Sequence, residues 1–208
     1  MRAPELAFLH DGPAGARATL VLAHGAGAPM DSPFMGWWAA ALGERGIHVV
    51  RFEFPYMRQR RASGGRRPPD REPVLLNAWR EVAARWPGAA IGGKSLGGRI
   101  ASMVADEVGA AALVCLGYPF HPPGRPEAPR IGHLEALTTP ALIVQGTNDP
   151  FGRREDVDRY RLAPGIRFAW VEGGNHDLER RGTPPESTWQ SVVDLVAGFL
   201  GGDSGAAR

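Results

Sequence analysis

Short apolar runs alternate along the chain with longer segments in which apolar residues recur at helical spacing. Runs without polar alternation are typical of strands buried on both faces of a sheet. Residues 19–23 form such a run, and we expect further strands at residues 47–54, 89–91, 111–116, 141–145 and 166–171, after a short edge strand at residues 5–9. Helical spacing predicts helices at residues 34–45, 73–86, 99–108 and 153–162, and a final amphipathic helix with Trp189, Val192, Val193, Val196 and Phe199 on one face. This alternation predicts an α/β fold with a doubly wound, mostly parallel sheet.

Three segments modify this simple alternation. Residues 58–71 contain six arginines among glycines and prolines, after a strand that Pro55 is expected to end, so we expect a mobile basic loop there. The stretch 117–137 is rich in proline, which argues against a helical cap domain at that point. Near the end of the chain, Thr183 and Glu186 have the spacing of a capping box for the final helix.

A glycine-rich stretch, GGKSLGG at 92–98, separates the strand expected at 89–91 from the helix that follows it. Within it, Gly93, Ser95 and Gly97 have the G-x-S-x-G spacing of a nucleophile elbow, the sharp strand-to-helix turn that exposes a reactive serine. The flanking positions must lack side chains because strand and helix approach closely there. The N-terminus of the following helix favours developing negative charge. The stretch therefore predicts Ser95 as a nucleophile.

The same letters also fit a phosphate-binding P-loop, since residues 88–95 match G-x-x-x-x-G-K-[ST]. That motif requires a buried strand that ends just before Gly88. Residues 75–86 instead have helical spacing, and Pro87 and Gly88 break that helix. We therefore favour the elbow.

Two more polar residues follow predicted strands, and they are the kinds of residue that a serine nucleophile requires. Asp149 and His176 come shortly after the strands at 141–145 and 166–171, so they and Ser95 are expected at the carboxyl edge of one parallel sheet. A serine hydroxyl needs an imidazole to take its proton, and the imidazole needs a carboxylate on its other nitrogen. We predict His176 as base and then acid, with Asp149 orienting it. The backbone N–H groups of Ala26 and Leu96 are expected to bind the oxyanion.

Each catalytic candidate also has a plainer interpretation. Ser95 could simply cap a helix, Asp149 could form a turn before Pro150, and His176 could belong to a solvated loop tip. Their shared position after strands favours the catalytic interpretation.

The pocket rim, or the layer behind the catalytic residues, is expected to include Lys94, His24, Gly25 and Tyr118. Lys94, the single lysine among 24 basic residues, should point away from Ser95 and contact a carboxylate or a backbone carbonyl. His24 precedes the serine, contrary to the order Ser…Asp…His, so we expect a structural role rather than that of a base. The remaining histidines suggest no function, and those at 121 and 133 are expected at the surface.

Composition excludes several classes of function. A chain of 208 residues, 43% hydrophobic and 22% charged, is expected to form one domain over residues 1–208. The absence of a membrane-spanning run and of a signal-peptide core, with Cys115 as the only cysteine, predicts a cytoplasmic protein that does not bind membranes. No ligand spacing indicates a metal, and no cofactor is expected. A net charge of +2 and a basic segment without interleaved aromatics predict no nucleic-acid partner.

Taken together, these motifs resemble those of small α/β-hydrolases of the dienelactone-hydrolase-like kind. Most closely, the chain is similar to a largely uncharacterised family that includes eukaryotic testis-expressed and NSL-complex subunit proteins. The resemblance rests on the stretches HGAG (24–27), GGKSLGGR (92–99), GYP with HPPG (117–124) and QGTNDPFG (145–152), of which the second and fourth are the most specific. It implies an α/β-hydrolase fold without a cap domain, and either an enzyme or a scaffold.

We therefore expect a serine hydrolase that cleaves an ester, thioester or related acyl bond through an acyl-enzyme. The alternative is a non-catalytic interaction module on the same fold. The expected partner of the enzyme is a small acyl substrate in a shallow, open pocket, anionic if the arginines of 58–71 overhang the entrance.

Overall fold

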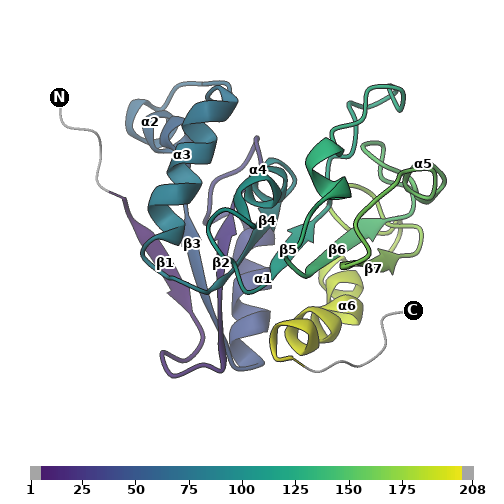
Figure 1. The fold of residues 1–208 in the computed structure, drawn as a ribbon. Coiled ribbons are helices and arrows are strands. Elements are labelled where there is room, and N and C mark those ends of the chain that lie inside the picture. The colour runs from purple at the N-terminus through teal and green to yellow at the C-terminus, as the bar shows by residue number, and fades with distance from the viewer. Residues whose placement is uncertain (1–5, 203–208) are drawn as a thin grey trace.

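The computed structural model describes residues 6–202, and a seven-stranded sheet forms its centre (Figure 1). The strand order is β1-β3-β2-β4-β5-β6-β7; β1 is antiparallel to β3, and all other neighbours are parallel. The strands are β1 (Phe8–Asp11), β2 (Ala18–Ala23), β3 (Ile47–Phe52), β4 (Ala90–Lys94), β5 (Leu113–Leu116), β6 (Ala141–Gly146) and β7 (Ile166–Val171). The predicted α/β fold with a mostly parallel sheet is confirmed, although the edge strand begins three residues later than expected.

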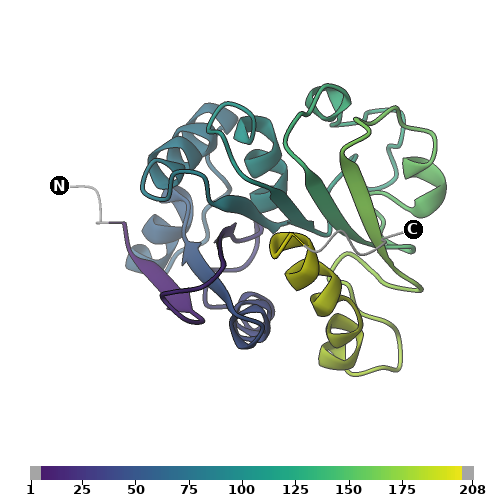
Figure 2. The same cartoon turned by 60° about the horizontal axis from the view of Figure 1, so that its bottom comes forward.

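Helices cover both faces of the sheet, because successive side chains of a buried strand point to opposite faces. In β2, Val21 and Ala23 belong to one core, whereas Leu20 and Leu22 belong to the other. The first core lies under α2 (Pro55–Ser63), α3 (Glu72–Ala83) and α4 (Leu96–Val104), and the second under α1 (Pro33–Glu44) and α6 (Pro185–Leu200). Figure 2 shows the dark blue α1 and the yellow α6 together on the face opposite the teal helices. No described helix has the length and apolar character needed to cross a membrane.

The segment expected as a mobile basic loop is helical in its first part, so that expectation is wrong for residues 58–63. Pro55 does not merely end a strand: it stands at the start of α2, where its fixed φ and missing N–H suit the first helical turn. Tyr56 and Met57 are buried in the core and anchor the helix. Asp70 returns to accept the Tyr56 N–H at 2.8 Å, and Gly64 ends the helix with φ +68°.

Two predictions near the C-terminal half are also corrected. The helix expected at 153–162 is limited to α5 (Arg154–Val157). The residues after it are irregular, and Tyr160 and Leu162 among them pack, partly buried, against the first core. The capping box of the final helix does not form, because α6 begins one residue later than that motif requires, with Pro184 as its N-cap and no side-chain cap.

No cap domain stands between β5 and β6 in the described chain. Residues 117–140 contain one short 3₁₀ helix, η1 (Gly132–Glu135), and are otherwise irregular. Tyr118 and Phe120 from this segment are fully buried, so it packs against the sheet layer rather than standing above it.

Candidate active site

The elbow forms as predicted at the junction of β4 and α4. Ser95 has φ +49° and ψ −113°, a backbone conformation that is strained for any residue with a side chain. A Cβ atom added to Gly93 or Gly97 would collide with the backbone of Ala23 in β2, which confirms why these positions carry glycine. The P-loop alternative is wrong, because five of its eight residues form the strand β4 and leave no loop to cradle a phosphate.

Ser95, His176 and Asp149 are brought together at the carboxyl edge of the sheet. His176 Nε2 lies 2.8 Å from Ser95 Oγ, and His176 Nδ1 lies 2.8 Å from Asp149 Oδ2. An ionised Asp149 can only accept, so Nδ1 carries the imidazole proton and Nε2 is free to accept the serine hydroxyl proton. This is the hydrogen-bond order required of a nucleophile, its base and the carboxylate that orients the base.

Asp149 is held rigidly beneath the histidine. Its carboxylate is fully buried. The Phe151 N–H donates to Oδ1 at 2.8 Å, and the Gln145 side-chain amide donates to Oδ2 at 2.8 Å. These bonds fix the orientation of the carboxylate and the oxygen that faces His176.

Gln145 and Phe151 are parts of this site that the sequence interpretation missed as individual residues. Gln145 is fully buried at the end of β6; its oxygen accepts the Tyr118 N–H at 2.7 Å, and its amide also reaches Gly152 O at 3.1 Å. The Phe151 ring lies 4.3 Å from the His176 ring between centroids and limits its rotation. A lone polar residue in a strand buried on both faces, four positions before Asp149, was the available signal for Gln145.

Lys94 makes the two kinds of contact expected of it. Its Nζ donates to the backbone oxygen of His176 at 2.5 Å and lies 3.1 Å from Asp177 Oδ1. It also stands 5.3 Å above the Phe34 ring centroid. Burial lowers the pKa of Lys94, and the nearby Asp177 carboxylate partly opposes that effect. Lys94 therefore ties the loop that bears His176 to the end of β4, directly before Ser95.

The two amides expected to bind an oxyanion lie on either side of Ser95 in the fold. Leu96 is the first residue of α4, and Ala26 lines the cavity beside Ser95. Neither N–H has a hydrogen-bond partner among the residues that the structure describes. Both are thus available to a ligand.

A cavity of about 310 Å³ opens beside Ser95 and His176. Most of its lining is apolar or backbone, which suits a small apolar group. The lining residues are Gly25, Ala26, Gly27, Ala28, Ser32, Phe34, Met35, Lys94, Ser95, Phe151, His176 and Asp177.

His24 and Tyr118, which were expected at the rim or behind the catalytic residues, do not line this cavity. His24 is fully buried, and burial lowers its pKa, so the neutral ring can donate from Nδ1 to Gly25 O at 2.7 Å and accept the Phe54 N–H on Nε2 at 3.1 Å. It shapes the loop that holds Gly25 and Ala26. Tyr118 lies behind the site. Its backbone N–H donates to the Gln145 side-chain oxygen, and its carbonyl oxygen accepts from the Gln145 side-chain nitrogen.

The expectation that His121 and His133 lie at the surface is wrong. His121 is only 2% exposed, with Nε2 3.4 Å from Asp156. His133 is half-buried, and its Nε2 lies 2.8 Å from the Ser102 hydroxyl. This second Ser–His pair is no rival site: Ser102 is buried in α4, its hydroxyl donates to Arg99 O, and it does not line the cavity beside Ser95.

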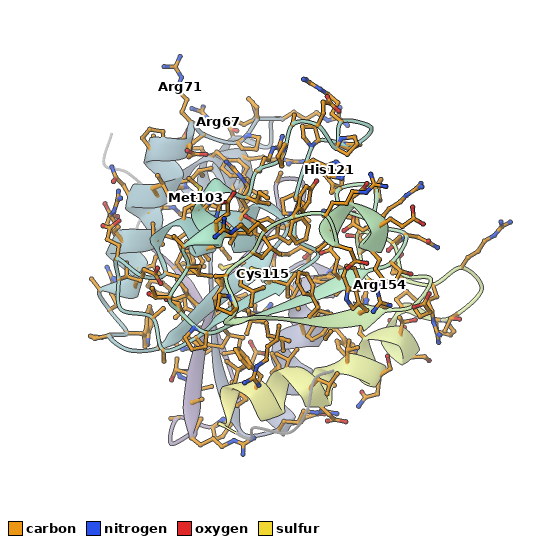
Figure 3. All side chains as sticks on the ribbon, turned by 45° about the vertical axis from the view of Figure 1, so that its right-hand side comes forward. Arg67, Arg71, Met103, Cys115, His121 and Arg154 are labelled. Carbon is orange, nitrogen blue, oxygen red and sulfur yellow. The ribbon has the colours of Figure 1, made fainter. Side chains whose placement is uncertain are left out.

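Metal-ligating side chains do not gather in groups of three within residues 6–202. Cys115 lies deep in the core, at the centre of the view in Figure 3, and burial raises its pKa, so it is a packing residue.

Comparisons with solved structures agree with this architecture. An α/β serine hydrolase homologue from Coxiella burnetii is 21% identical, with 98% of this chain and 95% of that chain covered and a TM-score of 0.66. An α/β serine hydrolase without a lid from Xanthomonas campestris is 19% identical, with 98% and 91% covered and a TM-score of 0.71. A dienelactone hydrolase from Anabaena variabilis is 19% identical, with 95% and 93% covered and a TM-score of 0.71. At these identities the likeness is one of fold. The α/β-hydrolase domain family matches residues 16–201, and the chain belongs to that family.

Proposed function

We propose that the protein is a serine hydrolase that cleaves an ester, thioester or related acyl bond through an acyl-enzyme. The observation that carries the proposal is the unbroken hydrogen-bond chain from Ser95 through His176 to Asp149, which ends at a strained serine facing a cavity. Strain of this kind persists in a fold only where the surrounding structure enforces it, and it is common at catalytic residues.

The reaction follows from the positions of the protons. His176 Nε2 takes the hydroxyl proton as Ser95 Oγ attacks the acyl carbon, and Asp149 stabilises the imidazolium that forms. The N–H groups of Ala26 and Leu96 bind the oxyanion of the tetrahedral intermediate. His176 then gives its proton to the leaving group, and the acyl-enzyme remains. Water attacks the acyl-enzyme in the second half, again with His176 as base, and restores the serine.

The cavity supports a small substrate. A volume of about 310 Å³ lies at the lower end of the range for small-molecule sites, and the apolar wall of Phe34, Met35 and Phe151 suits a short acyl chain. We infer that a short-chain acyl compound is the substrate class, and that the protein acts in the cytoplasm as one domain without a cofactor. Within the α/β-hydrolases, we place it nearest the uncharacterised family with testis-expressed and NSL-complex subunit members.

Labelling with a fluorophosphonate probe tests the proposal, because such a probe reacts only with an activated serine. Wild-type protein should be labelled at Ser95, and the Ser95→Ala and His176→Ala variants should not be. Ser187→Ala is the matched control, since Ser187 is an exposed serine of α6 and should leave labelling unchanged. Absence of labelling in folded wild-type protein would overturn the proposal and favour a non-catalytic module on this fold.

A further inference from the structure

A second hollow of about 340 Å³ adjoins the catalytic cavity, and Gly27 lines both. Its other lining residues are Arg60, Arg66, Arg67 and Pro68. Arg60 comes from α2, and the other three follow that helix in the segment that leads to α3. We call this feature the arginine hollow. It brings three guanidinium-bearing side chains to one surface depression beside Ser95.

The nearby carboxylates are already engaged elsewhere. Glu53 and Asp31 both pair with Arg61, at 2.6 and 2.7 Å. Asp70, the only acidic residue between 58 and 71, accepts the backbone N–H of Tyr56. In the described chain no ion pair involves an arginine of the hollow, and Arg60 Nη1 donates a hydrogen bond to Gly27 O at 3.3 Å.

This arrangement differs from an ordinary arginine-rich surface. Several other arginines meet a carboxylate from another element, as Arg51 meets Asp11 and Arg80 meets Glu107. Arg71, which lies outside the hollow, extends away from the body of the molecule in Figure 3. Three like charges that line one hollow repel one another unless an anion occupies it.

We propose that the arginine hollow is a subsite for an anionic group, a carboxylate or a phosphate, carried by the substrate at the end remote from the scissile acyl bond. The proposal rests on the proposed function, because Gly27 joins the hollow to the cavity where acyl transfer would occur. Arginine suits this role, since its planar fork binds carboxylate and phosphate oxygens in pairs. The substrate class is thus a short acyl ester with a terminal anion.

The test compares kcat/KM for an anionic ester, 4-nitrophenyl hemiglutarate, with that for the neutral 4-nitrophenyl butyrate. Wild-type protein should prefer the anionic ester at low salt, and the preference should fall as salt screens exposed charges. The triple variant Arg60→Gln, Arg66→Gln and Arg67→Gln should lower the ratio of the two kcat/KM values by roughly 10-fold. Arg71→Gln, which removes one arginine charge outside the hollow, should leave the ratio unchanged. An equal ratio in the triple variant and the wild type, or an equal fall in Arg71→Gln, would overturn the subsite.

A binding measurement separates failure of the subsite from failure of the hydrolase proposal. Ser95→Ala protein should bind glutarate or inorganic phosphate, measured by calorimetry, and the same protein with the triple substitution should not. The anion that binds more tightly identifies the chemistry of the substrate group. If neither ester is hydrolysed but this binding is seen and depends on the three arginines, the subsite stands and the hydrolase proposal fails. If neither anion binds, the subsite is overturned whatever the esters show.

Discussion

Replacement of Lys94 by methionine tests whether this residue stabilises the structure around the site or takes part in catalysis. The lysine Nζ makes a 2.5 Å hydrogen bond to the His176 backbone oxygen and a 3.1 Å contact with Asp177. Methionine keeps the apolar length of the side chain but removes the charge and its donors. We expect the variant to lose stability while it retains most of its turnover per folded molecule.

The size of the effect follows from these contacts. A hydrogen bond from a charged donor contributes about 1.5–3 kcal/mol, and loss of Lys94 also leaves the His176 carbonyl without this donor. The Asp177 carboxylate is 57% exposed, so that ion pair adds only about 0–1 kcal/mol. Burial lowers the pKa of Lys94, which shows that the charged form is poorly solvated, and removal of that charge offsets part of the loss. We expect a net destabilisation of about 1–2 kcal/mol, or a fall in Tm of roughly 2–8 °C for a chain of this size.

Turnover should change much less than in the nucleophile variant. The His176 ring keeps Asp149, Ser95 and Phe151 as neighbours in Lys94→Met, so kcat should fall by no more than about 10-fold, against about 10⁴-fold for Ser95→Ala. The measurements are thermal unfolding and kcat corrected for the folded fraction. An unchanged Tm with an activity loss as large as that of Ser95→Ala would refute this reasoning and make Lys94 a catalytic residue.

The single lysine allows its ionisation to be observed directly. Selective labelling of lysine with ¹³C gives one side-chain signal, because Lys94 is the only lysine in the chain. Its titration should occur below the ordinary lysine value of 10.5, since burial lowers its pKa. Asp177→Asn should lower the pKa further, because the carboxylate favours the charged amine. A titration at or above the ordinary value would mean that the amine is solvated.

Three other predictions test separate parts of the structure. Ser95→Ala and His176→Ala should each reduce kcat by about 10⁴-fold, and the double variant should be little worse, because the residues act as a unit; additive losses would show that His176 is not the partner. Burial alone would raise the pKa of Asp106, but hydrogen bonds from two threonines lower it to about 2. The carboxylate therefore stabilises the fold at neutral pH, and the stability difference between wild type and Asp106→Ala should shrink as the pH falls from about 4 to about 2 in urea unfolding. Gly97→Ala should destabilise by more than about 2 kcal/mol because its Cβ would meet the β2 backbone, whereas Gly132→Ala, which has open space around it, should be nearly neutral in the same assay.

The fold was largely predictable because each buried strand leaves a local signal. Continuous apolar runs located the core strands to within a few residues, and helical spacing located α1, α3, α4 and α6. The failures occurred where one residue type serves two structures. Pro55 was interpreted as a stop signal, yet proline is also favoured in the first turn of a helix. The arginines that follow make this segment read as a solvated loop. The burial of Tyr56 and Met57 depends on tertiary packing, which the sequence pattern does not show.

The candidate site was predictable only where chemistry and chain position coincide. Ser95, Asp149 and His176 each follow a strand of a parallel sheet, so the topology alone brings them to one edge. The sequence marks Gln145 only as a lone polar residue in a buried strand, because its role depends on which loop crosses the end of β6. It bonds to Asp149 and Gly152, which belong to the same stretch QGTNDPFG, and to the backbone of Tyr118, which reaches it only after folding. The motif alone does not reveal this support, because a buried amide satisfies its hydrogen bonds wherever the fold offers partners. Here the amide also bonds to the Asp149 carboxylate that lies against His176.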